Sequence, residues 1–143
     1  MTASQQSAEL RAALRPLLAS CGRVAVLGVG AQLRRDDYAG MAAAQALLPY
    51  ADGRRLLVAL GGAAPENCTG PIRQFGPDAV LVLDAAHMGL SPGEYAPLDP
   101  TRITGATFAT HMLPLPVTLY YLEAACGCAT AYIGIQPACT GQG

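Results

Sequence analysis

Two short runs of the sequence would be apolar on both faces of any strand they formed, and they limit the chain to few architectures. The first is RVAVLGVG (residues 23–30) and the second is DAVLVLDAA (residues 78–86). A strand with one solvated face alternates apolar and polar residues, which neither run does. Both runs therefore predict strands buried inside a sheet that is covered on both faces.

Helical patterns alternate with these runs. Leucines recur at helical spacing over residues 3–20, and the alanine-rich stretch of residues 37–48 is helical in character, with Pro49 as its stop. A third helix is predicted over residues 117–126. Its apolar face is expected to be the stripe of residues at positions i, i+3, i+4 and i+7, which are Val117, Tyr120, Tyr121 and Ala124.

Further strands are predicted over residues 54–60, ended by Gly61 and Gly62, and over residues 129–135. SPGEYAPLDP (residues 91–100) reads as a turn followed by a short edge segment. Strands that alternate with helices predict an α/β fold class, with one three-layer domain built on a twisted, mostly parallel sheet flanked by helices.

Composition agrees with a single folded domain. The chain has 143 residues, of which 52% are hydrophobic and 13% charged, and its net charge is −1. These values argue against disorder and against a nucleic-acid-binding surface. No apolar run reaches the roughly 20 residues that span a bilayer, and the N-terminus lacks the pattern of a secretory signal. We therefore expect a cytoplasmic monomer with no membrane or nucleic-acid partner.

The cysteines do not suggest a disulfide framework. There are five, an odd number in a chain without an export signal, and we expect free thiols. Cys126 and Cys128 form a CGC pair that could bind a soft metal. No second pair at zinc-site spacing accompanies them, so small buried residues are the favoured interpretation.

The polar residues that carry chemistry are expected at the carboxyl ends of the strands. Asp36 and Asp37 follow the first strand and its glycine turn, and Asp84 closes the third strand. Strands of a parallel sheet end at one rim, where ligands bind. His111 precedes the last helix, so two carboxylates and an imidazole could form a metal site for zinc, nickel, iron or manganese.

Other chemistries fit less well. A dinucleotide fingerprint needs a third glycine where Leu33 stands, and neighbouring carboxylates would repel phosphate. The P-loop, HExxH and GxSxG motifs are absent from the sequence. A small-ligand-binding α/β domain remains a further, weaker alternative.

Five motifs in order resemble the [NiFe]-hydrogenase maturation endopeptidases, most closely the branch that processes the large subunit of hydrogenase 3. They are GVGAQLRRDDYAG, GGAAPEN, VLVLDAAHMGLSPGE, THMLPLP and IGIQP, and together they cover about residues 23–137. The resemblance implies the phosphorylase/hydrolase-like fold of that family. It also implies an endopeptidase that removes the C-terminal extension of a nickel-loaded [NiFe]-hydrogenase large-subunit precursor.

The resemblance assigns residues as well. Asp37, Asp84 and His111 match the nickel-contacting, catalytic set, and the precursor supplies the nickel. Asp36 is the weaker candidate for the first place and is expected to cap the helix or pair with Arg35. His87 is not a family ligand, and the glycines and APEN turn of the second motif are expected to let a second strand-end loop approach the peptide.

The sequence also departs from the family pattern. Ala31 stands where relatives have Asn, and Arg35 where they have Gly. We expect a helical N-terminal extension (residues 1–22) and an endopeptidase domain (residues 23–143) that lacks the final helix of the relatives. The extension is expected to cover the face of the sheet that this final helix covers in the relatives. The alternative function is a non-cleaving, nickel-recognising docking module or an inactive truncated relative.

Overall fold

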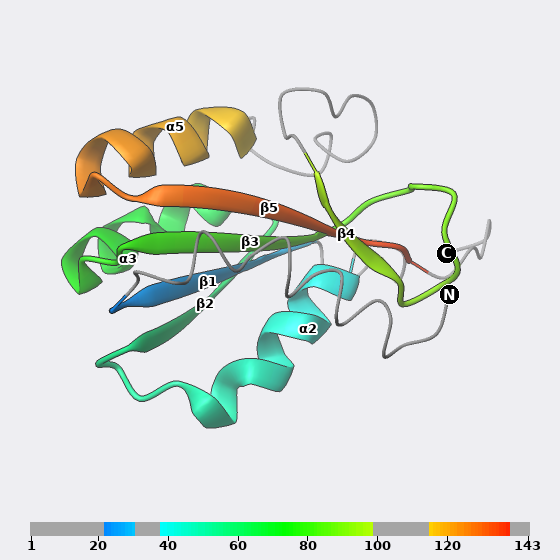
Figure 1. Cartoon of the computed structure of the whole chain (residues 1–143), viewed down its shortest axis with the longest axis horizontal. Coiled ribbons are helices and arrows are strands. Elements are labelled where there is room, and N and C mark those ends of the chain that lie inside the picture. The colour runs from blue at the N-terminus through cyan, green and yellow to red at the C-terminus, as the bar shows by residue number, and fades with distance from the viewer. Residues whose placement is uncertain (1–21, 31–37, 99–114, 138–143) are drawn as a thin grey trace.

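A five-stranded sheet forms the centre of the protein (Figure 1). The computed structural model describes residues 22–30, 38–98 and 115–137. The strands are β1 (Val24–Val29), β2 (Leu56–Gly62), β3 (Ala79–Ala85), β4 (Tyr95–Leu98) and β5 (Ala129–Ile135). The helices are α2 (Ala39–Leu47), α3 (Thr69–Phe75) and α5 (Leu115–Cys126), with the 3-10 helices η2 (Leu48–Tyr50) and η3 (Pro65–Cys68).

The strand order is β2-β1-β3-β5-β4. All neighbouring strands are parallel except β4, which runs antiparallel to β5 at one edge. The two runs that are apolar on both faces became β1 and β3, next to each other inside the sheet. The predicted α/β fold class, the mostly parallel sheet and the short edge segment are confirmed.

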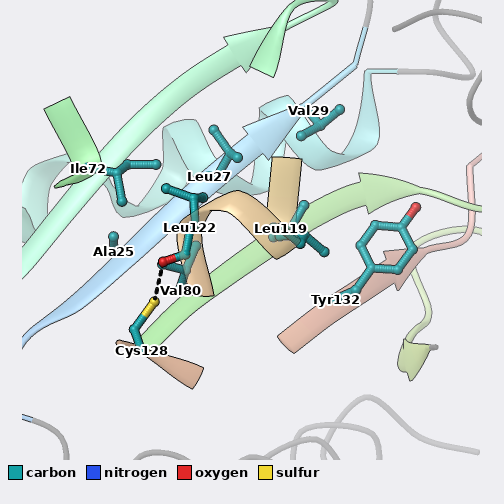
Figure 2. Packing of buried hydrophobic residues seen from close by; sticks show 10 residues of the cluster. Ala25, Leu27, Val29, Ile72, Val80, Leu119, Leu122, Cys128 and Tyr132 are labelled. Atoms are coloured by element: carbon teal, nitrogen blue, oxygen red, sulfur yellow. Dashed lines mark hydrogen bonds between the residues drawn. The ribbon is translucent and has the colours of Figure 1, made fainter. Parts of the chain in front are cut away.

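Helices cover both faces of the sheet. On one face of the sheet, side chains such as Leu27, Val80 and Tyr132 pack beneath α3 and α5 in the main hydrophobic cluster (Figure 2). Helix α2 packs on the other face, where Gly28 of β1 meets Ala44. The buried members of the cluster are Ala25, Leu27, Val29, Ile72, Val80, Val82, Leu119, Leu122, Cys128 and Tyr132.

The first turn of α2 lies directly on the backbone of β3. A Cβ atom at Gly40 would stand 2.6 Å from the carbonyl carbon of Leu83 and 2.7 Å from the Cα atom of Asp84. Carbon atoms cannot approach so closely, so only glycine allows this packing. The approach places the N-terminal turn of α2 against the end of β3 that carries Asp84.

The predicted apolar face of α5 is wrong, although the helix itself is confirmed. Val117, Tyr120 and Tyr121 are exposed, whereas Leu119 and Leu122 point into the cluster. Both stripes have helical spacing because the helix is apolar on nearly all sides. The branched aliphatic side chains fill the interior, and the tyrosines keep their hydroxyl groups near water.

Two further details differ from the prediction. The second strand ends at Gly62, at the predicted glycine pair, but both glycines are part of β2, and its register with β1 shifts between Gly28 and Val29. Helix α3 was not predicted, because Gly70 and Pro71 disfavour a helix. It ends at Gly76, which adopts φ 68° and donates its N–H to the carbonyl groups of residues 72 and 73.

Several expectations lie outside the described residues. The helix over residues 3–20, and with it the proposed cover of the sheet and the boundary at residue 22, stays a prediction. Within the described ranges, no helix has the length and hydropathy needed to cross a membrane.

We expect Gly40→Ala to destabilise the protein by about 1–3 kcal/mol, because the added methyl group must push α2 away from β3. Thermal unfolding followed by circular dichroism measures the change. Gly70→Ala is the matched control, since a Cβ atom at this helical glycine would meet nothing within 4 Å. Equal melting temperatures for Gly40→Ala and the unmodified protein would contradict the packing described above.

Candidate functional site

Asp84 lies near the carboxyl end of β3, the central strand of the sheet. It pairs with Gly134 of β5 and is only 3% exposed. A carboxyl group this deep is costly unless polar groups hold it. The position at the rim of the sheet is the one predicted from the sequence.

Tyr132 of β5 holds the Asp84 carboxyl group. Its hydroxyl donates a hydrogen bond of 2.8 Å to Oδ2 of Asp84. Burial, together with the adjacent carboxyl group, raises the pKa of Tyr132 well above its usual range. Tyr132 therefore keeps its proton and acts as a donor, which fixes the orientation of the carboxyl group.

Gln136 holds the loop that follows Asp84. Its side-chain Oε1 accepts hydrogen bonds from the backbone N–H groups of Met88, at 2.6 Å, and Leu90, at 3.4 Å. Its backbone N–H donates to the carbonyl oxygen of Glu94 at 2.7 Å. This glutamine of the IGIQP motif therefore ties the end of β5 to the loop beyond β3. His87, in the same loop, is exposed.

Of the residues predicted for the site, the structure describes Asp84 alone. Asp37, His111, Asp36 and Arg35 lie outside the described residues. The chain that follows Asp37 leads through Tyr38 into α2, whose first turn packs on the backbone of Asp84. Over residues 22–30, 38–98 and 115–137, no cluster of three His, Cys, Asp or Glu side chains could hold a metal ion.

Sequence reasoning missed Tyr132 and gave Gln136 no role. A tyrosine in the otherwise small or apolar strand ATAYIGI was a usable signal, because a buried phenol needs a hydrogen-bond partner. Its partner could not be identified without the register of β3 and β5, which pairs Val82 with Tyr132 and Asp84 with Gly134.

The opposite rim of the sheet carries a hollow of about 560 Å³. Two of the three arginines that line it already bond to the protein: Arg23 Nη1 donates to the Phe75 carbonyl oxygen, and Arg55 Nε donates to that of Gly22. Backbone N–H groups of Arg23 and Gly22 lower the pKa of Asp78. These interactions join strand starts to loops, so we assign this hollow a structural role.

The described cysteines are free thiols, as predicted. Cys128 is buried in the main cluster, with its Sγ 3.6 Å from the carbonyl oxygen of Leu122 (Figure 2). Burial raises the pKa of Cys128 to about 11, which keeps the thiol protonated. The CGC pair therefore acts here as part of the packing.

Comparison with known proteins gives a consistent result. The family model of the hydrogenase maturation proteases matches residues 44–141. This chain belongs to the hydrogenase maturation protease family. It is therefore an endopeptidase of hydrogenase maturation, and the predicted resemblance and enzyme class are confirmed.

Individual relatives agree with this assignment. The hydrogenase 3 maturation protease of Escherichia coli K12 is 35% identical over 113 residues, covering 78% of this chain and 71% of the relative. The crystal structure of a [NiFe] hydrogenase maturation protease from Thermococcus kodakarensis superimposes with a TM-score of 0.75 at 32% identity, covering 88% and 81% of the two chains. The solution structure of an endopeptidase from E. coli gives a TM-score of 0.64 at 35% identity, covering 80% and 73%.

We expect Tyr132→Phe to lower the free energy of unfolding by about 1–3 kcal/mol, because it removes one hydrogen-bond donor from a buried carboxyl group. Chemical denaturation measures the loss. Tyr120→Phe is the control, since Tyr120 is 74% exposed and its hydroxyl contributes less than about 0.5 kcal/mol. A Tyr132→Phe protein as stable as the control variant would show that the bond to Asp84 contributes nothing.

Proposed function

We propose that this chain removes the C-terminal extension of a nickel-loaded [NiFe]-hydrogenase large-subunit precursor. In this proposal nickel belongs to the substrate and serves as the element that the enzyme recognises. Asp37, Asp84 and His111 are the residues that meet it. The observation that supports the proposal best is the buried Asp84 carboxyl group at the carboxyl-end rim of the sheet, in a chain of the hydrogenase maturation protease family.

The chemistry of the donor set fits nickel. Carboxylate oxygens and imidazole nitrogen are ligands that nickel accepts, and three of them leave positions for groups of the substrate. Asp84 is suited to this role because the Tyr132 hydroxyl occupies one side of its carboxyl group at 2.8 Å. The bond orients the carboxyl group before the substrate arrives, so less freedom is lost on binding.

The neighbouring elements would position the other two groups. Asp37 precedes α2, which begins at Ala39 and packs against the end of β3. His111 precedes α5, which begins at Leu115. A metal held by these three groups would be able to polarise a carbonyl group or lower the pKa of a water molecule. The role of the enzyme is to orient the precursor so that the scissile bond of the precursor lies at this rim.

The test of nickel recognition compares two forms of the same precursor. Purified enzyme is incubated with a nickel-loaded and a nickel-free large-subunit precursor, and cleavage is followed by gel mobility and mass spectrometry. We expect cleavage of the nickel-loaded form only. Cleavage of both forms would exclude nickel as the recognition element. Nickel-dependent binding without cleavage would instead favour a docking module.

We expect Asp84→Asn to reduce the processing rate by about 10- to 100-fold, because removal of metal-contacting or supporting groups commonly costs this much. The folded state should persist, which circular dichroism checks. Asp52→Asn is the matched control, since Asp52 is an exposed residue that accepts backbone N–H groups before β2. An unchanged rate in the Asp84 variant would remove this residue from the site.

A further inference from the structure

A hollow of about 330 Å³ lies between η3 and the first turns of α5. It is lined by Glu66, Thr69, Val117, Thr118 and Tyr121. Glu66 and Thr69 lie just beyond the end of β2, and the other three come from the helix that packs on the same sheet face as α3. The wall therefore combines a carboxylate, hydroxyl groups, an aromatic ring and an aliphatic side chain.

Two side-chain oxygen atoms of these lining residues are buried without a hydrogen-bond partner among the described residues. They are Oε2 of Glu66 and Oγ1 of Thr118. Thr118 is only 2% exposed. Buried polar atoms are nearly always hydrogen-bonded, so two such atoms in one hollow indicate a missing donor. Thr69 cannot supply it, because its hydroxyl donates to the carbonyl oxygen of Glu66 at 2.9 Å.

We propose that this hollow binds the guanidinium group of an arginine side chain from the peptide substrate. Both orphaned atoms can accept hydrogen bonds, and one of them belongs to a carboxylate, which favours a cation. A guanidinium group presents several N–H donors in a fixed plane, can therefore bond two acceptors at once, and stacks on aromatic rings such as that of Tyr121. The aliphatic part of an arginine would contact Val117.

The nearby arginine of the protein does not fill this role. Arg73 Nη1 donates to the Tyr121 hydroxyl at 2.9 Å, and Arg73 is not among the residues that line the hollow. The bond also holds the tyrosine side chain in place. The ring thus forms a fixed wall, and the Glu66 oxygen keeps its capacity to accept.

The hollow lies on the same side of the molecule as Asp84. Leu119, the neighbour of Thr118, packs in the same cluster as Tyr132, whose hydroxyl reaches Asp84 (Figure 2). The end of β2 and the end of β3 belong to one rim of the parallel sheet. One extended peptide could contact both places. The assignment to a substrate subsite, as distinct from arginine binding itself, rests on the proposed function.

Binding is tested directly on the full chain by NMR. Nitrogen-15-labelled protein is titrated with N-acetyl-arginine-N-methylamide, and in parallel with the citrulline analogue, which has nearly the same shape but no charge. We expect the arginine probe to shift the amide signals of Glu66, Thr118 and Tyr121. We expect the citrulline probe to bind at least about tenfold more weakly, because it lacks the charge-assisted bond.

Two variants separate the roles of the orphaned oxygens. Glu66→Gln keeps the shape and removes the charge, and we expect at least about tenfold weaker binding of the arginine probe. Thr118→Val removes the hydroxyl alone. It should weaken binding without lowering the melting temperature, because the hydroxyl makes no bond in the free protein. Glu123→Gln is the control, an exposed carboxylate on the same helix outside the hollow.

The outcomes distinguish this proposal from the proposed function. Absence of shifts at the hollow, or equal affinities for both probes, would overturn it whether or not the precursor is cleaved. Unchanged binding in both Glu66→Gln and Thr118→Val would overturn it as well. Arginine binding in an enzyme that cleaves no precursor would establish the site and refute the processing activity. If cleavage occurs, Glu66→Gln should raise KM more than it lowers kcat.

Discussion

The structure depends on a buried carboxyl group at the end of a central strand. Asp84 ends a run of apolar residues in β3, between β1 and β5, where water cannot solvate it. A carboxyl group at such a place destabilises the fold unless its polar atoms are bonded. Tyr132 supplies one of these bonds from the neighbouring strand. The need to bond this carboxyl group therefore links the register of β3 and β5 to the position of Asp84 at the rim of the sheet.

The elements around Asp84 are arranged with little freedom. On one face, Gly40 allows α2 to lie against the backbone at Leu83 and Asp84. On the other, Tyr132 fills the space beneath α5. Beyond the strand, Gln136 fixes the loop through Met88 and Leu90. A site made of such elements is preorganised, because packing and hydrogen bonds hold each element in place before a substrate binds.

Much of the fold could be predicted from local pattern. The runs that became β1 and β3 are apolar on both faces, which few structures accommodate. The predictions that failed concern features that depend on the tertiary structure. Hydrophobic periodicity did not show which of two apolar stripes of α5 faces the core. Helix α3 was missed because Gly70 and Pro71 disfavour a helix. Local pattern also could not show that the register of β1 and β2 shifts at Gly61, where a Cβ atom would lie 2.8 Å from the Cα atom of Pro65.

In the described part of the candidate site, the sequence could single out only a residue that contradicts its surroundings. Asp84 stood out because a charged residue follows apolar ones. Tyr132 did not, because a bond across 48 residues depends on strand register. Glu66 and Thr118 are hidden for a related reason: each is ordinary in its own segment, and only folding brings their unbonded oxygens to one hollow. Such unmet hydrogen-bonding capacity persists against a stability cost, which is why it points to a ligand rather than to the fold.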